Sequence, residues 1–341
     1  MYQRKSRRYG ALMLAVSLCL RLCMFLGLDA RAAAFISHAA QSKDFARWML
    51  FLETGQAVTL PEPEPERLYV LEILPEEQEE LPEEIPEEVP VVQSTSLSLA
   101  ESVSVAGACT YLYDKAALLA RPTQMDFSGS GPHVLIVHTH GSEAYAPTAS
   151  YRSLDPEQTV IRVGEVLAQT LEQHGISVIH DKQINDYPSY NNSYWNTLNQ
   201  IEYWKSQYPS LQMVIDVHRD GAEDEQGNAL ALSTQAGGEN CAKLMLVVGT
   251  DQGGLSHPNW QENLANALKL QSVLEGAYPG LCRPIDLRTE RFNQHATPGS
   301  ILVEVGSHGN TLSQAVASAE LLGESLAAMI ETLIANNGTL Q

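Results

Sequence analysis

The stretch Val134-Leu135-Ile136-Val137-His138-Thr139-His140-Gly141-Ser142-Glu143 joins an apolar run to a polar cluster. The four apolar residues predict a buried β-strand, and open α/β sheets place their chemistry where such strands end. His140 and Glu143 lie three residues apart, so one turn of backbone can direct both side chains toward a common point. With a distant histidine they would make the ligand set of a catalytic zinc ion that keeps one open position. Alone, this spacing is equally typical of solvated histidines beside a loop carboxylate.

Strand and helix patterns alternate along the chain after this stretch. Apolar residues at helical spacing predict helices over residues 157–174, 194–207, 256–276 and 312–334. Short apolar runs predict further strands over residues 176–179, 211–218, 244–248 and 301–304. Gly175 is the expected C-terminal cap of the first helix, and Ser256 the expected N-cap of the third. The alternation predicts an α/β fold, with a mostly parallel sheet covered by helices on both faces in a single catalytic domain over residues 110–341.

Three of the predicted strands end in a histidine or a glutamate. The first leads to His140, the third ends at His218, and the last ends at Glu304. Because the carboxyl ends of parallel strands lie along one edge of a sheet, these groups can converge although they are far apart in the sequence. Taken singly, His218 is also typical of a hydrogen-bonded core histidine, and Glu304 of a helix-capping carboxylate.

A metal site follows from this convergence. His140, Glu143 and His218 are the predicted zinc ligands, and a water molecule would take the fourth position. His138 is an alternative ligand in place of Glu143, because it lies on the same face as His140 if the strand continues that far. The sequence leaves both ligand sets open.

Other polar residues near the strand ends complete the predicted site. Zinc lowers the pKa of a bound water to around 7, and Glu304 is the predicted base that takes its proton and returns it to the leaving amine. Asp216, on the same strand face as His218, is expected to orient the His218 ring. Arg219 and His295 are candidate substrate contacts, and Arg219 is equally suited to a local ion pair.

Composition and the N-terminus bear on partners and location. A formal net charge of −20 argues against a nucleic-acid partner, which requires a basic surface. Basic residues before an apolar segment at 11–28 predict an N-in orientation, with the rest of the chain outside. Residues 1–34 are therefore a single-pass membrane anchor or, with Ala30-Arg31-Ala32 as a cleavage-like site, a signal peptide. The catalytic domain is expected on the outer, wall-facing side of the cell membrane, or secreted if this segment is cleaved.

Residues 35–109 are predicted to be a juxtamembrane segment followed by a linker. Proline and glutamate alternate between residues 61 and 90. Proline stiffens such a run and like charges extend it, so this part is a spacer with no core of its own.

Several motifs occur in one order over about 200 residues. They are Ile136-Val137-His138-Thr139-His140 with Glu143 and Tyr145, Gly175-Ile176-Ser177-Val178-Ile179-His180-Asp181, Asp186-Tyr187-Pro188-Ser189-Tyr190-Asn191, Asp216-Val217-His218-Arg219-Asp220, Phe292-Asn293-Gln294-His295, Pro298-Gly299, and Glu304-Val305-Gly306-Ser307 with Asn310-Thr311. In these motifs the chain resembles the stage II sporulation protein P family of exported peptidoglycan hydrolases. That family is similar to the zinc-dependent N-acetylmuramoyl-L-alanine amidases, which share a His/Glu/His metal site and a catalytic glutamate on a late strand.

The resemblance implies a substrate, a reaction and partners. The enzyme would use Zn²⁺ to cut the amide between N-acetylmuramic acid and the L-alanine of the stem peptide, and also peptide cross-links, during engulfment of the forespore. Stage II sporulation proteins D and M would be its partners. Asn293 and Asn310, which lie in the shared motifs, would contact substrate or support the site. The domain at 110–341 would be amidase-like.

Other functions fit the same residues. A zinc carboxypeptidase or endopeptidase that acts only on stem peptides needs the same ligands and the same late glutamate. A glycosidase that pairs Glu143 with Glu304 would leave the histidines unused. A non-catalytic wall-binding module is the alternative outside enzymes.

Overall fold

The computed structural model describes residues 103–148 and 150–340. The predicted N-terminal anchor and most of the acidic linker lie outside these residues. Within them, no helix combines the length and the apolar character needed to cross a membrane.

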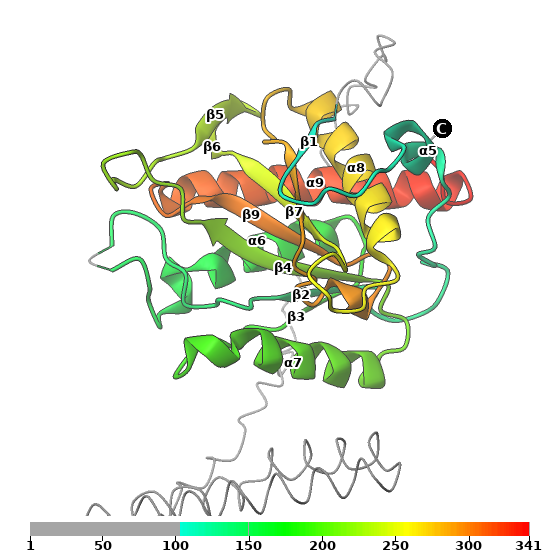
Figure 1. The fold of residues 1–341 in the computed structure, drawn as a ribbon, viewed down its shortest axis with the longest axis horizontal. Helices are drawn as coiled ribbons and strands as arrows, with labels where there is room; N and C mark the ends of the chain where they lie inside the picture. The colour runs from blue at the N-terminus through cyan, green and yellow to red at the C-terminus, as the bar shows by residue number, and fades with distance from the viewer. Residues whose placement is uncertain (1–102, 149, 341) are drawn as a thin grey trace, which may run out of the picture. The chain divides into compact units, whose positions relative to one another are not determined.

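A seven-stranded sheet forms the centre of the fold, in the order β1-β8-β7-β9-β4-β2-β3 (Figure 1). Its strands are β1 (Val105–Ala106), β2 (Val134–Val137), β3 (Val178–His180), β4 (Met213–Asp220), β7 (Leu244–Gly249), β8 (Ile285–Arg288) and β9 (Ile301–Ser307). Every neighbouring pair is parallel except β7 and β9, which are antiparallel. The predicted α/β class with a mostly parallel sheet is confirmed.

Several strands were not predicted from the sequence. β1 pairs with β8 at the edge of the sheet, so the folded unit includes residues before the predicted start at 110. A separate antiparallel hairpin joins β5 (Ser233–Ala236) to β6 (Glu239–Ala242).

Between residues 103 and 340 the structure has five α-helices and three single 3₁₀ turns. They are α5 (Lys115–Ala120), η1 (Pro156–Gln158), α6 (Val160–Gln173), η2 (Tyr190–Asn192), α7 (Ser193–Gln207), α8 (Trp260–Ala277), η3 (Gln294–Ala296) and α9 (Leu312–Ala335). Thr159 caps α6 by accepting a hydrogen bond from the backbone N–H of Ile161. Thr311 and Gln314 form a capping box at the start of α9. The predicted cap at Ser256 is wrong: α8 begins at Trp260, and the carbonyl of Ser256 instead accepts a hydrogen bond from the Arg291 guanidinium.

Helices cover both faces of the sheet, but unequally. On one face, alternate residues of β2, β4, β7 and β9 pack with α6, α8 and α9 in one large apolar cluster. On the other face, a smaller cluster joins Leu135, Val137 and Val214 to Ile201 of α7. α7 covers only part of this face. Where it ends, residues on the same side of the sheet as Val214, among them His218 and Glu304, line a cavity. The cavity therefore lies where the second helical layer ends.

Gly164 of α6 is predicted to be intolerant of any side chain. A methyl group added there would lie 2.5 Å from Cε1 of the buried His138 ring and 2.9 Å from Nε2 of the half-buried His180 ring, and the Nε2 atoms of these two rings are 2.8 Å apart. Alanine is the better helix former, yet we expect Gly164→Ala to lower the free energy of unfolding by about 1–3 kcal/mol because the packed rings must move. Denaturant unfolding measures this change.

The matched control is Gly276→Ala in α8, where an added methyl group meets nothing within 4 Å. This substitution should leave stability unchanged or raise it by up to about 1 kcal/mol. Equal effects of the two substitutions would contradict the steric argument.

Candidate active site

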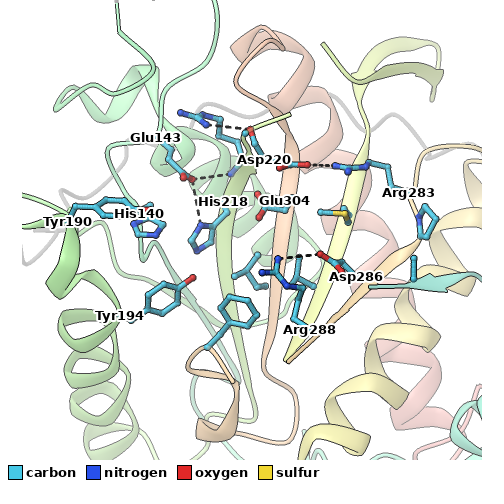
Figure 2. A pocket seen from close by; sticks show the side chains of 18 of the residues that line it. His140, Glu143, Tyr190, Tyr194, His218, Asp220, Arg283, Asp286, Arg288 and Glu304 are labelled. Carbon is cyan, nitrogen blue, oxygen red and sulfur yellow. Dashed lines mark hydrogen bonds and ion pairs between the residues drawn. The ribbon is translucent and has the colours of Figure 1, made fainter. Parts of the chain in front are cut away.

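A cavity of about 690 Å³ lies over the exposed part of the second sheet face (Figure 2). Five of the predicted site residues line it: His140, Glu143, His218, Arg219 and Glu304. They come from the turn after β2, from β4 and from β9, so the structure brings together residues more than 150 positions apart in the chain.

The turn after β2 places His140 and Glu143 at the cavity. β2 ends at Val137, and the backbone N–H of Glu143 donates to the carbonyl of His140 at 3.0 Å. Asp186 holds this turn, because its carboxylate accepts hydrogen bonds from the backbone N–H and the hydroxyl of Ser142 at 3.1 and 2.6 Å. The same carboxylate lies 4.0 Å from Nδ1 of His140. Asp186 therefore fixes the turn that carries His140.

His218 lies between two carboxylates. Its Nδ1 is 3.6 Å from Oε2 of Glu143, and its Nε2 is 3.1 Å from Oδ1 of Asp216. Asp216 is fixed in turn by the backbone N–H and the hydroxyl of Thr139, at 2.8 and 2.6 Å. Burial alone would lower the pKa of His218, but Asp216 and Glu143 outweigh it and hold that pKa well above its usual value. This position therefore favours a positive charge.

His140 and His218 face each other at close range. Their ring centroids are 5.3 Å apart and their planes are nearly perpendicular, at 88°. The ring of Tyr190 stacks on His140 with a centroid distance of 4.5 Å, which fixes the orientation of the imidazole. Two imidazoles that bind one tetrahedral zinc ion at Zn–N distances of about 2.1 Å have ring centroids roughly 5 Å apart. The centroid separation of His140 and His218 matches this value.

Glu304 lies beside His218 on the neighbouring strand. The two residues are direct partners in the register of β4 and β9. The Oε2 atom of Glu304 is buried without a hydrogen-bond partner among the described residues. Burial, together with the negative charges of Glu143 and Asp220, raises the pKa of Glu304 to about 8. A carboxyl group in this state can exchange a proton near neutral pH.

His138 lies outside the cluster, contrary to the alternative ligand set. It points to the opposite face of the sheet, where its Nδ1 is 3.3 Å from the carbonyl of Val217 and its Nε2 is 2.8 Å from His180. Both ring nitrogens therefore have partners. The physical reason is that β2 ends at Val137, so His140 does not continue the alternation that would put the two histidines on one face.

The remaining predicted residues divide into two groups. Asp216 and Arg219 lie at the site: the guanidinium of Arg219 donates to the carbonyls of Ala144 and Tyr151, and its backbone N–H donates to Glu143 at 3.2 Å. Arg219 thus supports the ligand turn. The structure does not bring Asn293, His295 and Asn310 to the cavity wall.

Local contacts explain the positions of these three residues. The side-chain amide of Asn293 donates to the carbonyl of Tyr194, and His295 lies in η3 against His257. The side-chain oxygen of Asn310 accepts from the backbone N–H groups of Leu232 and Ser307. Asn293 and Asn310 thus tie neighbouring loops together, and a role in substrate binding or site support for the three residues stays a prediction.

The sequence did not predict several other residues of the cavity wall. They are Arg152, Tyr190, Tyr194, Arg283, Asp286, Arg288 and Phe292. Tyr190 belonged to one of the recognised motifs, but nothing in its spacing indicated a contact with His140.

The donor chemistry of the cluster fits a zinc ion, although the side chains are not arranged around one. Two imidazoles and a carboxylate are typical ligands of catalytic zinc, and Nδ1 of His140 is buried without a hydrogen-bond partner in the described part of the chain. Between residues 103 and 340, however, no group of three His, Cys, Asp or Glu side chains could hold a metal ion as it stands. Zinc binding would therefore require the side chains to shift.

Comparison with known proteins places the chain in a family. The family model described as Stage II sporulation protein P (SpoIIP) matches residues 60–327. A search of curated protein sequences finds no match.

Solved structures of N-acetylmuramoyl-L-alanine amidases show similarity at low identity. AmiC2 of Nostoc punctiforme is 16% identical, with 61% of this chain and 100% of that chain covered and a TM-score of 0.36. The CwlD amidase from Clostridioides difficile, solved in complex with the GerS lipoprotein, is 13% identical, with 60% and 98% covered and a TM-score of 0.38. Ami1 from Mycobacterium abscessus is 11% identical, with 60% and 100% covered and a TM-score of 0.35.

Proposed function

Because the chain belongs to the stage II sporulation protein P family, we propose that it is a zinc-dependent peptidoglycan hydrolase. Its principal reaction would be hydrolysis of the amide between N-acetylmuramic acid and the L-alanine of the stem peptide. The observation that supports this proposal most is the meeting of His140, Glu143, His218 and Glu304 in one cavity. These are the groups that metal-assisted amide hydrolysis requires.

His140, Glu143 and His218 would hold the zinc ion. When bound, zinc would polarise the amide carbonyl and lower the pKa of a water molecule. The residues around the ligands are suited to this arrangement, because Asp216 fixes the His218 ring and Asp186 fixes the turn that carries His140. Such supporting groups keep the ligating atoms aimed at a common point.

Glu304 would move the proton. Its side chain lies next to His218, and its buried Oε2 atom accepts no hydrogen bond from the described residues. It would accept a proton from the attacking water and return it to the nitrogen of the leaving L-alanine.

Analysis of the products from purified cell wall tests the reaction. The full chain, loaded with zinc, is expected to release stem peptides that begin with a free L-alanine amine, which mass spectrometry and amine labelling detect. Shortened stems that remain attached to sugar would favour the carboxypeptidase or endopeptidase alternative. Wall binding with no new amine would favour a non-catalytic module.

The cellular setting belongs to the same proposal. Family membership supports a role in sporulation, and we place the enzyme in forespore engulfment with stage II sporulation proteins D and M as partners. The basic and apolar character of residues 1–34 supports export, with retention in the membrane as a single-pass anchor. Peptide cross-links are a second expected substrate.

A further inference from the structure

The two ends of the cavity differ in chemistry. At one end, Tyr190 and Tyr194 surround His140; at the other, Arg283, Asp286 and Arg288 approach from β8 and the residues before it (Figure 2). His218 and Glu304 lie between these ends. A substrate whose scissile bond lies at Glu304 would therefore extend toward the aromatic rings, where Arg152 lies over Tyr190, on one side and toward Arg283 and Arg288 on the other.

Arginines are concentrated at this cavity. Seven arginines occur between residues 103 and 340, and four of them, Arg152, Arg219, Arg283 and Arg288, line it. Two of the four already serve the ligand turn: Arg219 donates to backbone carbonyls, and Arg152 pairs with the buried carboxylate of Asp186. Arg283 is held by a short ion pair with Asp220, at 2.6 Å.

Among the four, Arg288 has the most exposed carboxylate partner. Its side chain is 39% exposed, with Nη1 3.5 Å from Asp286 and Nε 3.2 Å from Glu290. Glu290 is itself 55% exposed, so solvent screens this pair and a ligand can replace it. The guanidinium lies 6.0 Å from the centre of the Phe292 ring, which limits the directions in which it can move.

We propose that Arg288 binds the α-carboxylate of the D-glutamate in the stem peptide, so that the peptide side of the scissile amide lies over β8 and the sugar side lies toward Tyr190. This inference rests on the proposed function. The argument is charge complementarity: the stem peptide carries free carboxylates, whereas the sugar beside the scissile bond is neutral. A guanidinium presents its N–H groups in a planar fork that matches a carboxylate.

A pair of muramyl dipeptides tests this directly. N-acetylmuramyl-L-alanyl-D-glutamate has a free α-carboxylate, whereas the D-isoglutamine form has a neutral amide at that position. We expect the full chain to bind the acid about tenfold more tightly than the amide, as measured by NMR titration. Arg288→Gln should abolish this preference, and Arg288→Lys should retain only part of it because lysine lacks the planar fork.

Arg162→Gln is the matched control. Arg162 lies on α6, outside the cavity, and pairs with Glu157 and Glu165 at 3.8 and 3.7 Å. The control must keep the full preference for the acid, and all variants must keep the wild-type unfolding midpoint. The inference is overturned if the wild-type chain does not prefer the acid, which includes binding neither ligand. It is also overturned if the preference survives Arg288→Gln.

Turnover of the same two ligands separates this inference from the proposed function. Preferential binding of the acid without cleavage of either ligand would support the role of Arg288 and contradict the amidase. Cleavage of both ligands with equal affinity would support the amidase and contradict the role of Arg288.

Discussion

Glu304→Gln is expected to lower kcat on purified cell wall by roughly 10²- to 10⁴-fold. Glutamine has nearly the same shape as glutamate, so the cavity and the neighbouring His218 should keep their positions. What the variant lacks is a group that can accept and return a proton. Release of labelled stem peptides measures the rate, and co-sedimentation with cell wall measures binding, which should remain.

The control for this variant is Glu172→Gln, an exposed glutamate of α6. It should keep the wild-type rate. Unchanged turnover in Glu304→Gln would exclude Glu304 as the base, and joint loss of turnover and of the folded state would point to a structural role instead.

Glu304→Gln should also change how the folding stability of the metal-free protein depends on pH. The folded-state pKa of Glu304 is raised by burial to about 8, above the ordinary value of 4.5. A carboxyl group with a raised folded pKa favours folding in its protonated form, so this stabilisation is complete below pH 4.5 and is lost as the pH rises toward 8. Glu304→Gln should remove this loss, so the variant should be more stable than wild type at pH 8 by denaturant titration.

Removal of zinc is the second large effect that we expect. Treatment of the full chain with a chelator should reduce lytic activity by about 10³-fold or more, because several kcal/mol of transition-state stabilisation would be lost. Zinc added back in stoichiometric amount should restore the rate. Elemental analysis should find close to one zinc ion per chain, and undiminished activity in a chain shown to be metal-free would exclude a metal mechanism.

Variants of two histidines test the ligand assignment. His218→Ala should lose zinc from the chain, since it removes the imidazole between Glu143 and Asp216. His174→Ala is the control, because that side chain is 42% exposed at the end of α6 and pairs with Glu331 at 3.9 Å. Full zinc content in His218→Ala would contradict the proposed site.

The sequence predicted that the residues at the ends of three strands meet, because these strands are parallel neighbours in the sheet. β2, β4 and β9 are neighbours in the sheet, so their carboxyl ends bring His140, His218 and Glu304 together as expected. The assignment of roles to these residues stays a prediction. The two-residue alternation also explains His138, whose side chain lies on the α6 face with Ile136.

The other wall of the cavity was missed because β8 has a weak signal. Ile285-Asp286-Leu287-Arg288 is only four residues long and directly follows a proline, so it does not stand out as an apolar run. Its alternation is nevertheless typical of a half-buried strand, with Ile285 and Leu287 in the core and Asp286 and Arg288 facing the cavity. The hairpin at residues 233–242 likewise carries a Gly237-Gly238 turn, which is a known hairpin signal.

Sequence patterns could not show the side-chain contacts that fix the site. The contact of Tyr190 with His140 and the hydrogen bonds from Ser142 to Asp186 join segments whose relative positions depend on the loops after β2 and β3. Loop geometry has no periodicity from which it can be predicted.

The single antiparallel junction of the sheet, between β7 and β9, has a consequence for how substrate preference can change. It separates the strands that carry His218 and Glu304 from those that carry Asp286 and Arg288. Residues on either side of this boundary line the same cavity, yet they belong to groups of strands that run in opposite directions and are joined by one row of hydrogen bonds. If the proposed roles hold, substitutions at positions 286 and 288 would change which stem peptides are accepted without altering the strands that carry His218 and Glu304.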